Sequence, residues 1–355
     1  MDTNLEVKTH DWVADDGSLR LELASNSASS HLQRTRSTLG LHPVAPLDQE
    51  HDHDERQKLL WSRVRIALRE PFAEFFGTMI LVLFGDGSVA QVVLSGNKSG
   101  SYQSIAWCWG IGVMLGVYVA GDSGGYLNPA VLFCNCFFRQ LPWRRFPIYF
   151  IAEVLGAFIG SGIVYANYYA AIDSFEGGPG IRTVPPAPKA TAGIFCTYPQ
   201  PFLSNGTQLI SEFVASAILM FVIFALTDRS NNGGVKSSKL VPLCLLFLVY
   251  GIGAAFGWQT GYAINLARDF GPRLMSYAVG YGPQVWSAGG YYFWVPMVAP
   301  FCGCAFGGLL YDVFIYTGRS PVNTPWLGLK HVFSPSYALK ARRERHRKAK
   351  DEGIV

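Results

Sequence analysis

Two asparagine tripeptides are the part of this chain best suited to chemistry. Asn128-Pro129-Ala130 and Asn265-Leu266-Ala267 each open a short apolar segment. Asparagine is a good helix N-cap, and proline fits the first helical turn. A half-helix inside a membrane also has unpaired N–H groups and a positive dipole end. Two such ends pointing at one another would repel cations and hydrated protons, and the two amides would donate hydrogen bonds to a neutral molecule.

Each tripeptide follows a glutamate at a matched distance. Glu74 lies 54 residues before Asn128, and Glu212 lies 53 residues before Asn265. This repeat, with an offset of about 138 residues in a membrane-type sequence, indicates two halves of similar structure. We expect both buried carboxylates to accept hydrogen bonds from backbone N–H groups of the loops before the short segments. A proton-relay role for them would instead imply a coupled transporter.

Arg268 follows three residues after Asn265. An arginine at membrane depth is costly and is therefore a functional candidate. We expect it to face a passage, donate to water or hydroxyl oxygens and repel cations. Asp269 is expected to hold nearby backbone or Arg273, since adjacent helix residues do not face each other and an Arg268–Asp269 pair is disfavoured. Leu266 replaces the proline of the first tripeptide, so the fixed backbone angle is lost and a bulkier side chain is present. The width of the passage at this point is therefore not determined by the sequence.

Membrane helices must position these residues. Half of the 355 residues are hydrophobic and 15% are charged, whereas soluble domains have about 25% charged residues. Six stretches have the roughly 20 apolar residues that span a bilayer; they lie near 72–95, 102–121, 146–170, 208–227, 239–257 and 291–317. Two shorter stretches, 128–138 and 265–276, suit half-helices that enter and return on one side.

The distribution of basic residues predicts the orientation. Arginine and lysine are frequent before the first span, after the first short segment, between spans four and five, and after span six. Both termini are therefore predicted to be cytoplasmic. Because each half has three spans, an odd number, the two halves are inverted relative to one another. The expected division is a disordered tail (1–70), a channel domain (71–318, with repeats of about 71–170 and 208–317) and a basic tail (319–355). That basic tail either lies on anionic lipid or remains in solvent.

The core lacks the residues of an enzyme or metal site. The seven histidines all lie outside the apolar region: His10, His31, His42, His51, His53, His331 and His346. The seven cysteines form no metal-type spacing, and no nucleophile–base pair appears in the core. We therefore expect no enzymatic activity, no metal, no cofactor and no nucleic-acid partner.

Taken together, these residues resemble the major intrinsic proteins, the aquaporin and aquaglyceroporin family, over about residues 70–318. The resemblance rests on the paired asparagine boxes, the two glutamate motifs and the run from Ala267 to Arg273. It implies an all-α membrane protein with six transmembrane helices and two re-entrant half-helices in an inverted repeat, one pore per subunit and a homotetramer. The leucine in the second box and the long tails look similar to fungal members.

Members of that family use four side chains at the narrowest point of the pore, and the resemblance nominates Trp109, Gly253, Tyr262 and Arg268. Water-selective relatives typically have histidine where this chain has Gly253, so glycine is expected to leave room. Two aromatic faces would then line the carbon side of a polyol. Asp269 directly after the arginine is typical of aquaglyceroporins. Tyr262 stands where glycerol channels often have phenylalanine, and its hydroxyl would narrow or polarise the filter.

The sequence thus predicts a passive plasma-membrane channel for water, glycerol and other small polyols that excludes protons and ions. Membrane lipids are its expected surroundings. A water-selective channel, or a gated or closed channel of the same fold, is the alternative. Two further alternatives are less favoured. One is a proton-coupled transporter that uses Glu74, Glu212 or Asp86 as proton relays, and the other is a non-conducting scaffold. Asp86 otherwise faces an outer vestibule or lies near the interface.

Overall fold

The computed structural model describes residues 59–324 and Leu327. The expectations for most of both tails therefore lie outside the described residues. The described residues up to Arg69 belong to one unit and those from Glu70 onward to another. In the first unit, Leu60–Ala67 form the helix α3. The disorder expected for 1–70 thus does not extend to these residues, whose sequence contains neither glycine nor proline and permits a helix.

Six helices of the described part are long and apolar enough to cross a membrane, as predicted. They are α4 (Arg69–Leu94), α5 (Tyr102–Val119), α7 (Arg145–Glu176), α8 (Asn205–Thr227), α9 (Val241–Phe256) and α12 (Trp294–Phe314). The span that contains α9 begins at Ser238, with the 3-10 turn directly before the helix. The main difference is at α7, which continues six residues beyond the predicted end at 170. It stops only at Gly177, whose φ of 98° is the left-handed conformation of a helix C-terminus.

Two short helices begin at the predicted tripeptides. They are α6 (Pro129–Phe138) and α10 (Leu266–Ser276). After α10 the chain forms a π turn at Tyr277–Tyr281 and the helix α11 (Gln284–Tyr291), neither of which was predicted. Three single 3-10 turns, Ala192–Ile194, Ser238–Leu240 and Pro321–Asn323, lie in the connecting loops. All regular secondary structure of the described residues is therefore helical.

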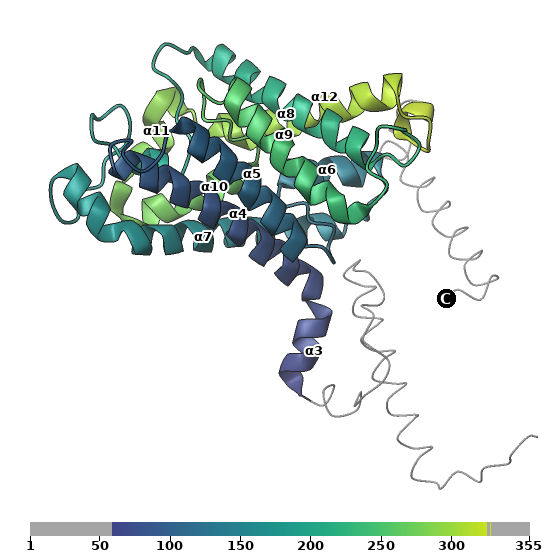
Figure 1. Ribbon diagram of the computed structural model, residues 1–355, viewed down its shortest axis with the longest axis horizontal. Helices are drawn as coiled ribbons and strands as arrows, with labels where there is room; N and C mark the ends of the chain where they lie inside the picture. The colour runs from purple at the N-terminus through teal and green to yellow at the C-terminus, as the bar shows by residue number, and fades with distance from the viewer. Residues whose placement is uncertain (1–58, 325–326, 328–355) are drawn as a thin grey trace, which may run out of the picture. The chain divides into compact units, whose positions relative to one another are not determined.

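The helices of the second unit pack in pairs, two of which join the first half of the sequence to the second (Figure 1). Helix α12 packs along α8, α9 along α5, and α10 against α7. Glycines make the closest approaches possible, as is common between membrane helices. A Cβ on Gly156 of α7 would lie 2.2 Å from the carbonyl oxygen of Phe75, and one on Gly303 of α12 would lie 2.4 Å from that of Phe213. Because Phe75 and Phe213 each follow the repeated glutamate, the two contacts are equivalent.

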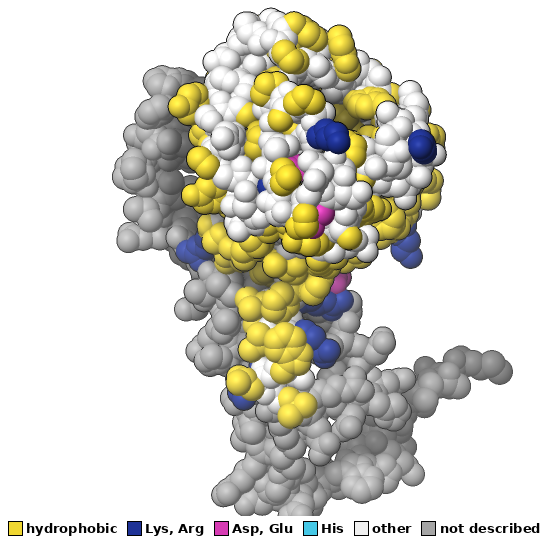
Figure 2. All heavy atoms as spheres, turned by 90° about the vertical axis from the view of Figure 1, so that its left-hand side faces the viewer, with side chains coloured by type: hydrophobic (Ala, Val, Ile, Leu, Met, Phe, Trp, Pro, Cys, Tyr) yellow, Lys and Arg dark blue, Asp and Glu magenta, His cyan; other side chains and the backbone are white. Residues whose placement is uncertain are grey.

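The loop from Gly177 to Ser204 belongs to one end of the helices, which faces the viewer in Figure 2. Few charged side chains appear on this end, and hydrophobic side chains gather along its flanks. Several helices also carry exposed large hydrophobic residues, for example Ile151 and Leu155 of α7. Apolar flanks around a more polar end fit a protein whose helices contact lipid.

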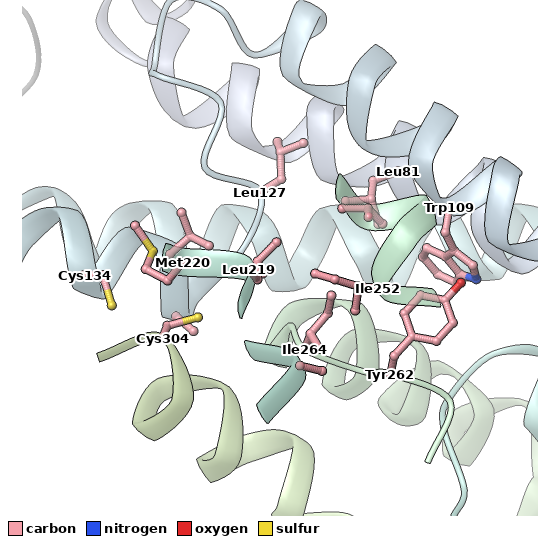
Figure 3. Close-up of a cluster of buried hydrophobic side chains, with 14 of the residues drawn as sticks. Leu81, Trp109, Leu127, Cys134, Leu219, Met220, Ile252, Tyr262, Ile264 and Cys304 are labelled. Carbon is pink, nitrogen blue, oxygen red and sulfur yellow. The ribbon is translucent and has the colours of Figure 1, made fainter. Parts of the chain in front are cut away.

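Buried apolar side chains from both halves form one cluster in the centre of the second unit. Figure 3 shows this cluster extending from Cys134 and Cys304 at one end to Trp109 and Tyr262 at the other. Trp109 comes from α5 and Tyr262 from the loop before α10. The cluster therefore brings two of the nominated residues, 153 positions apart in the chain, to the same place.

Candidate functional site

The two asparagines cap the short helices in the same way. The Oδ1 atom of Asn128 accepts from the Ala130 N–H at 3.0 Å, and that of Asn265 accepts from the Ala267 N–H at 2.9 Å. Their backbone angles agree within 2°, with φ of −154° and −152° and ψ of 114° and 116°. Leu266 therefore takes the first helical position as Pro129 does, without a change in the cap.

Each asparagine also reaches across to the other half. The Nδ2 atom of Asn128 donates to the Ile264 carbonyl at 2.9 Å, and that of Asn265 donates to the Leu127 carbonyl at 2.7 Å. The N-termini of α6 and α10 therefore meet. Because an amide nitrogen carries two hydrogens, each side chain retains one N–H for another acceptor.

The repeated glutamates hold the loops that lead to these caps. Glu74 accepts from the backbone N–H groups of Tyr126 and Leu127 at 3.0 and 2.9 Å. Glu212 accepts from those of Ala263 and Ile264 at 2.9 and 2.8 Å. Both carboxylates are fully buried, and the bonds are of the kind expected for them.

These bonds fix an unusual backbone. Leu127 and Ile264, directly before the asparagines, have φ angles of 51° and 42°, in the left-handed region that residues with a side chain seldom adopt. Such a conformation costs about 1–3 kcal/mol and persists only when the surroundings impose it. The carboxylates supply that constraint, and the strained turn directs the Leu127 and Ile264 carbonyls to the asparagine amides.

Arg268 lies in the first turn of α10 and is only 7% exposed. Its Nη1 atom donates to the Phe195 carbonyl at 3.0 Å and lies 3.8 Å from Asp86 Oδ1. Its guanidinium carbon lies 3.9 Å from the centre of the Trp109 ring, a cation–π distance. Three separate segments thus hold one guanidinium.

Asp269 does not pair with its neighbour Arg268. Its carboxylate receives Arg273 Nε at 2.8 Å, together with the N–H and hydroxyl of Thr197 at 2.7 and 2.6 Å. Arg273 Nη2 donates in turn to the Thr197 carbonyl at 2.7 Å. The pair fixes the loop from Gly177 to Ser204, here named the outer loop, against α10, which places the Phe195 carbonyl within reach of Arg268.

Two cavities lie on either side of three of the nominated residues. The inner cavity, of about 270 Å³, is lined by Arg268, Asn265, Asn128 and Thr227 among others. The outer cavity, of about 490 Å³, is lined by residues of the outer loop, including Tyr198 and Gln200. Trp109, Tyr262 and Arg268 border both cavities. Arg268 is the one charged side chain among the described residues that line either of them.

Gly253 is placed differently from the other three. It lines neither cavity, and a Cβ on it would lie 2.7 Å from Cζ of Tyr262 and 2.8 Å from its hydroxyl. The Tyr102 hydroxyl donates to the Gly253 carbonyl at 3.0 Å. The space that glycine provides is therefore occupied by the Tyr262 ring, whose hydroxyl has no hydrogen-bond partner among the described residues.

The wall of the outer cavity is uncharged near neutral pH apart from Arg268. Tyr198 lines this cavity beside Cys196. Burial raises the pKa of Tyr198, and it raises the pKa of Cys196 to about 11. Both groups therefore stay protonated. A solute in the outer cavity meets a wall with neutral polar groups and one cation.

The sequence did not assign partners to two buried carboxylates. Asp86 of α4 contacts Arg268, and Glu153 of α7 is fully buried; neither carboxylate has a hydrogen bond within the described residues. A carboxylate in a membrane helix is itself a signal. Its partner could not be read from the sequence, because Asp86 and Arg268 are 182 residues apart.

A model of the family described as "Major intrinsic protein" matches residues 61–311. The chain belongs to the major intrinsic protein family. The resemblance drawn from its motifs is thereby confirmed, and its six spans make this member a multi-pass integral membrane protein.

Individual relatives within the major intrinsic proteins are similar over most of this chain. "Aquaglyceroporin-9" of Botryotinia fuckeliana is 66% identical over 286 residues, which are 81% of this chain and 62% of that protein. This chain thus spans less than two thirds of that relative's length. "Probable aquaglyceroporin-2" of Gibberella zeae is 63% identical over 79% of this chain and 82% of that protein.

The fold of this family member also resembles a solved one. The X-ray structure of the aquaglyceroporin from Plasmodium falciparum matches with a TM-score of 0.62 and 31% sequence identity. The match covers 70% of this chain and 96% of the other. The six spans and two half-helices predicted from the sequence are therefore an aquaglyceroporin-type architecture.

Proposed function

We propose that this major intrinsic protein is a passive channel for water and glycerol that excludes protons and ions. One observation carries the proposal: Trp109, Tyr262 and Arg268 border both cavities, and Arg268 is the one charged side chain in the described lining. A neutral solute passing between the cavities meets these three residues. The two aromatic rings suit carbon atoms, and the guanidinium suits hydroxyl oxygens.

The asparagines act below this constriction. Asn128 and Asn265 line the inner cavity and keep one amide hydrogen each for a solute oxygen. The meeting N-termini of α6 and α10 add positive dipole ends, which disfavour cations and hydrated protons. Glu74 and Glu212 have a structural role, because their oxygens are engaged by backbone N–H groups.

The wider arrangement follows the family. The channel domain covers about 71–318, each subunit holds its own passage, and four subunits assemble. The proposed site is the plasma membrane, with both termini on the cytoplasmic side. The relatives named aquaglyceroporin, at 66% and 63% identity, support glycerol as a solute.

Parallel flux measurements test the proposal. Purified full-length protein in proteoliposomes is expected to accelerate both water efflux and glycerol uptake, each followed by stopped-flow light scattering. Voltage clamp of cells expressing the protein is expected to show no added current. Water flux without glycerol flux would establish the water-selective alternative, current would favour the transporter, and no flux at all would favour a closed or scaffolding protein.

Enlarging Gly253 is expected to impair glycerol passage. In Gly253→Ala the new Cβ lies 2.7 Å from the Tyr262 ring, so the ring must move toward the passage. Overpacking of this kind costs about 1–3 kcal/mol, and glycerol flux is expected to fall at least about fivefold. Gly251→Ala is the matched control, because a Cβ there meets nothing within 4 Å. Equal glycerol flux in both variants would contradict the packing argument.

A further inference from the structure

Asp86 is a buried acid that has no role in the loops or caps described above. It lies in α4 with no exposed surface, and neither carboxylate oxygen has a hydrogen-bond partner within the described residues. A carboxylate at membrane depth is costly, so its position calls for a charged partner. Its ion-pair partner is Arg268, at 3.8 Å between Oδ1 and Nη1.

Among the described residues, no other carboxylate forms an ion pair with Arg268. Asp269, the neighbour in sequence, is engaged by Arg273 and Thr197 through four hydrogen bonds. Glu212 is engaged by the loop before α10. The distance of 3.8 Å exceeds a hydrogen bond but lies within the range of an ion pair. Asp86 therefore reaches Arg268 through its charge and leaves the guanidinium hydrogens to other acceptors.

The sequence around Asp86 creates this approach. Gly85, the preceding residue, lies under the Trp109 ring, where a Cβ would come within 2.3 Å of ring carbons. The same ring carries the Arg268 guanidinium on its face, at 3.9 Å. Gly85 thus lets the indole pack against α4, and Asp86 lies beside the cation that the indole supports.

Resting on the proposed channel function, we propose that Asp86 is a specificity-determining residue that weakens the hold of Arg268 on hydroxyl solutes. A passage must bind its solute well enough to admit it and weakly enough to release it. A guanidinium without a counter-ion, buried to 93%, would bind polyol oxygens tightly. The Asp86 carboxylate, which lines neither cavity, offsets part of that charge. Solutes with several hydroxyl groups, such as glycerol, are the class most affected.

Tracer exchange of glycerol across proteoliposomes tests this role. In Asp86→Asn the shape is kept and the charge removed, so the half-saturating glycerol concentration is expected to fall about fivefold or more and the maximal flux to fall with it. The half-saturating concentration does not depend on the fraction of folded protein. An unchanged half-saturating concentration, whatever the maximal flux, would overturn the proposal. If Asp86→Asn cannot be purified, Asp86→Ser is expected to give the same shift.

Two further variants separate this proposal from the channel function itself. Asp173→Asn is the matched control, because Asp173 pairs with Arg182 at 2.8 Å and lines neither cavity; its half-saturating concentration is expected to equal that of the wild type. In the Arg268→Ala background, Asp86→Asn is expected to leave the half-saturating glycerol concentration unchanged, since residues that act as a pair are not additive. A full Asp86→Asn effect in that background would refute action through Arg268. Altered selectivity in Arg268→Ala without any effect of Asp86→Asn would leave the channel proposal standing alone.

Discussion

Arg268→Ala is expected to raise erythritol flux relative to glycerol flux by about tenfold or more. The guanidinium borders both cavities together with the rings of Trp109 and Tyr262. Its removal therefore widens the passage and takes away the fixed hydrogen-bond donors. A tenfold change corresponds to about 1.4 kcal/mol, which is modest for the loss of a buried, hydrogen-bonded charge. The variant also leaves Asp86 without its counter-ion, so current under voltage clamp is expected to become detectable and cation-selective.

The measurement compares erythritol, glycerol and water flux in proteoliposomes with equal amounts of protein. Arg229→Ala is a suitable control, because Arg229 is exposed in the loop between α8 and α9 and lines neither cavity. An unchanged erythritol-to-glycerol ratio in Arg268→Ala would disprove the filter assignment. It would do so without affecting the family membership, which rests on the match over residues 61–311.

Glu212→Ala is expected to destabilise the protein strongly. The change leaves the backbone N–H groups of Ala263 and Ile264 without acceptors, at about 1–3 kcal/mol for each buried group. It also releases the left-handed turn at Ile264. For a domain of this size a loss of about 2–6 kcal/mol lowers the unfolding temperature by roughly 5 °C or more. Thermal unfolding of the purified protein in detergent measures the effect.

The variant Glu212→Gln separates the carboxylate's charge from its hydrogen bonds. It keeps one acceptor oxygen and is expected to lose less stability than Glu212→Ala. Glu74→Ala is expected to match Glu212→Ala, because Glu74 makes the equivalent bonds to Tyr126 and Leu127. If Glu212→Ala unfolded at the wild-type temperature, the carboxylate would not be what holds the turn.

Features that depend on neighbouring residues were predictable from the sequence. The apolar runs located the spans, because their length is set by the bilayer. The asparagine caps of α6 and α10 were predictable because a cap involves residues only two or three positions apart. The leucine in the second box did not change this result, since leucine is an adequate residue for a first helical turn.

Features that depend on distant segments were not predictable. The sequence suggested that Gly253 leaves room for solute, whereas the structure gives this space to Tyr262, which lies nine residues away and takes a φ of 39°. The pairing of Asp86 with Arg268 joins α4 to α10. The role of the outer loop depends on the Phe195 carbonyl, and backbone groups carry no signature in residue type. The predicted end of α7 is too early because the residues after 170 are less apolar, although they remain helical.

The exchange of hydrogen bonds between the two asparagines also orders events during biosynthesis. Asn128 donates to a carbonyl at residue 264, and Asn265 donates to one at residue 127. Synthesis proceeds from the N-terminus, so α6 enters the membrane before the acceptor of its capping residue has left the ribosome. The first half therefore waits in the bilayer with an unsatisfied amide. Docking of the second half is the step that completes both capping centres at once.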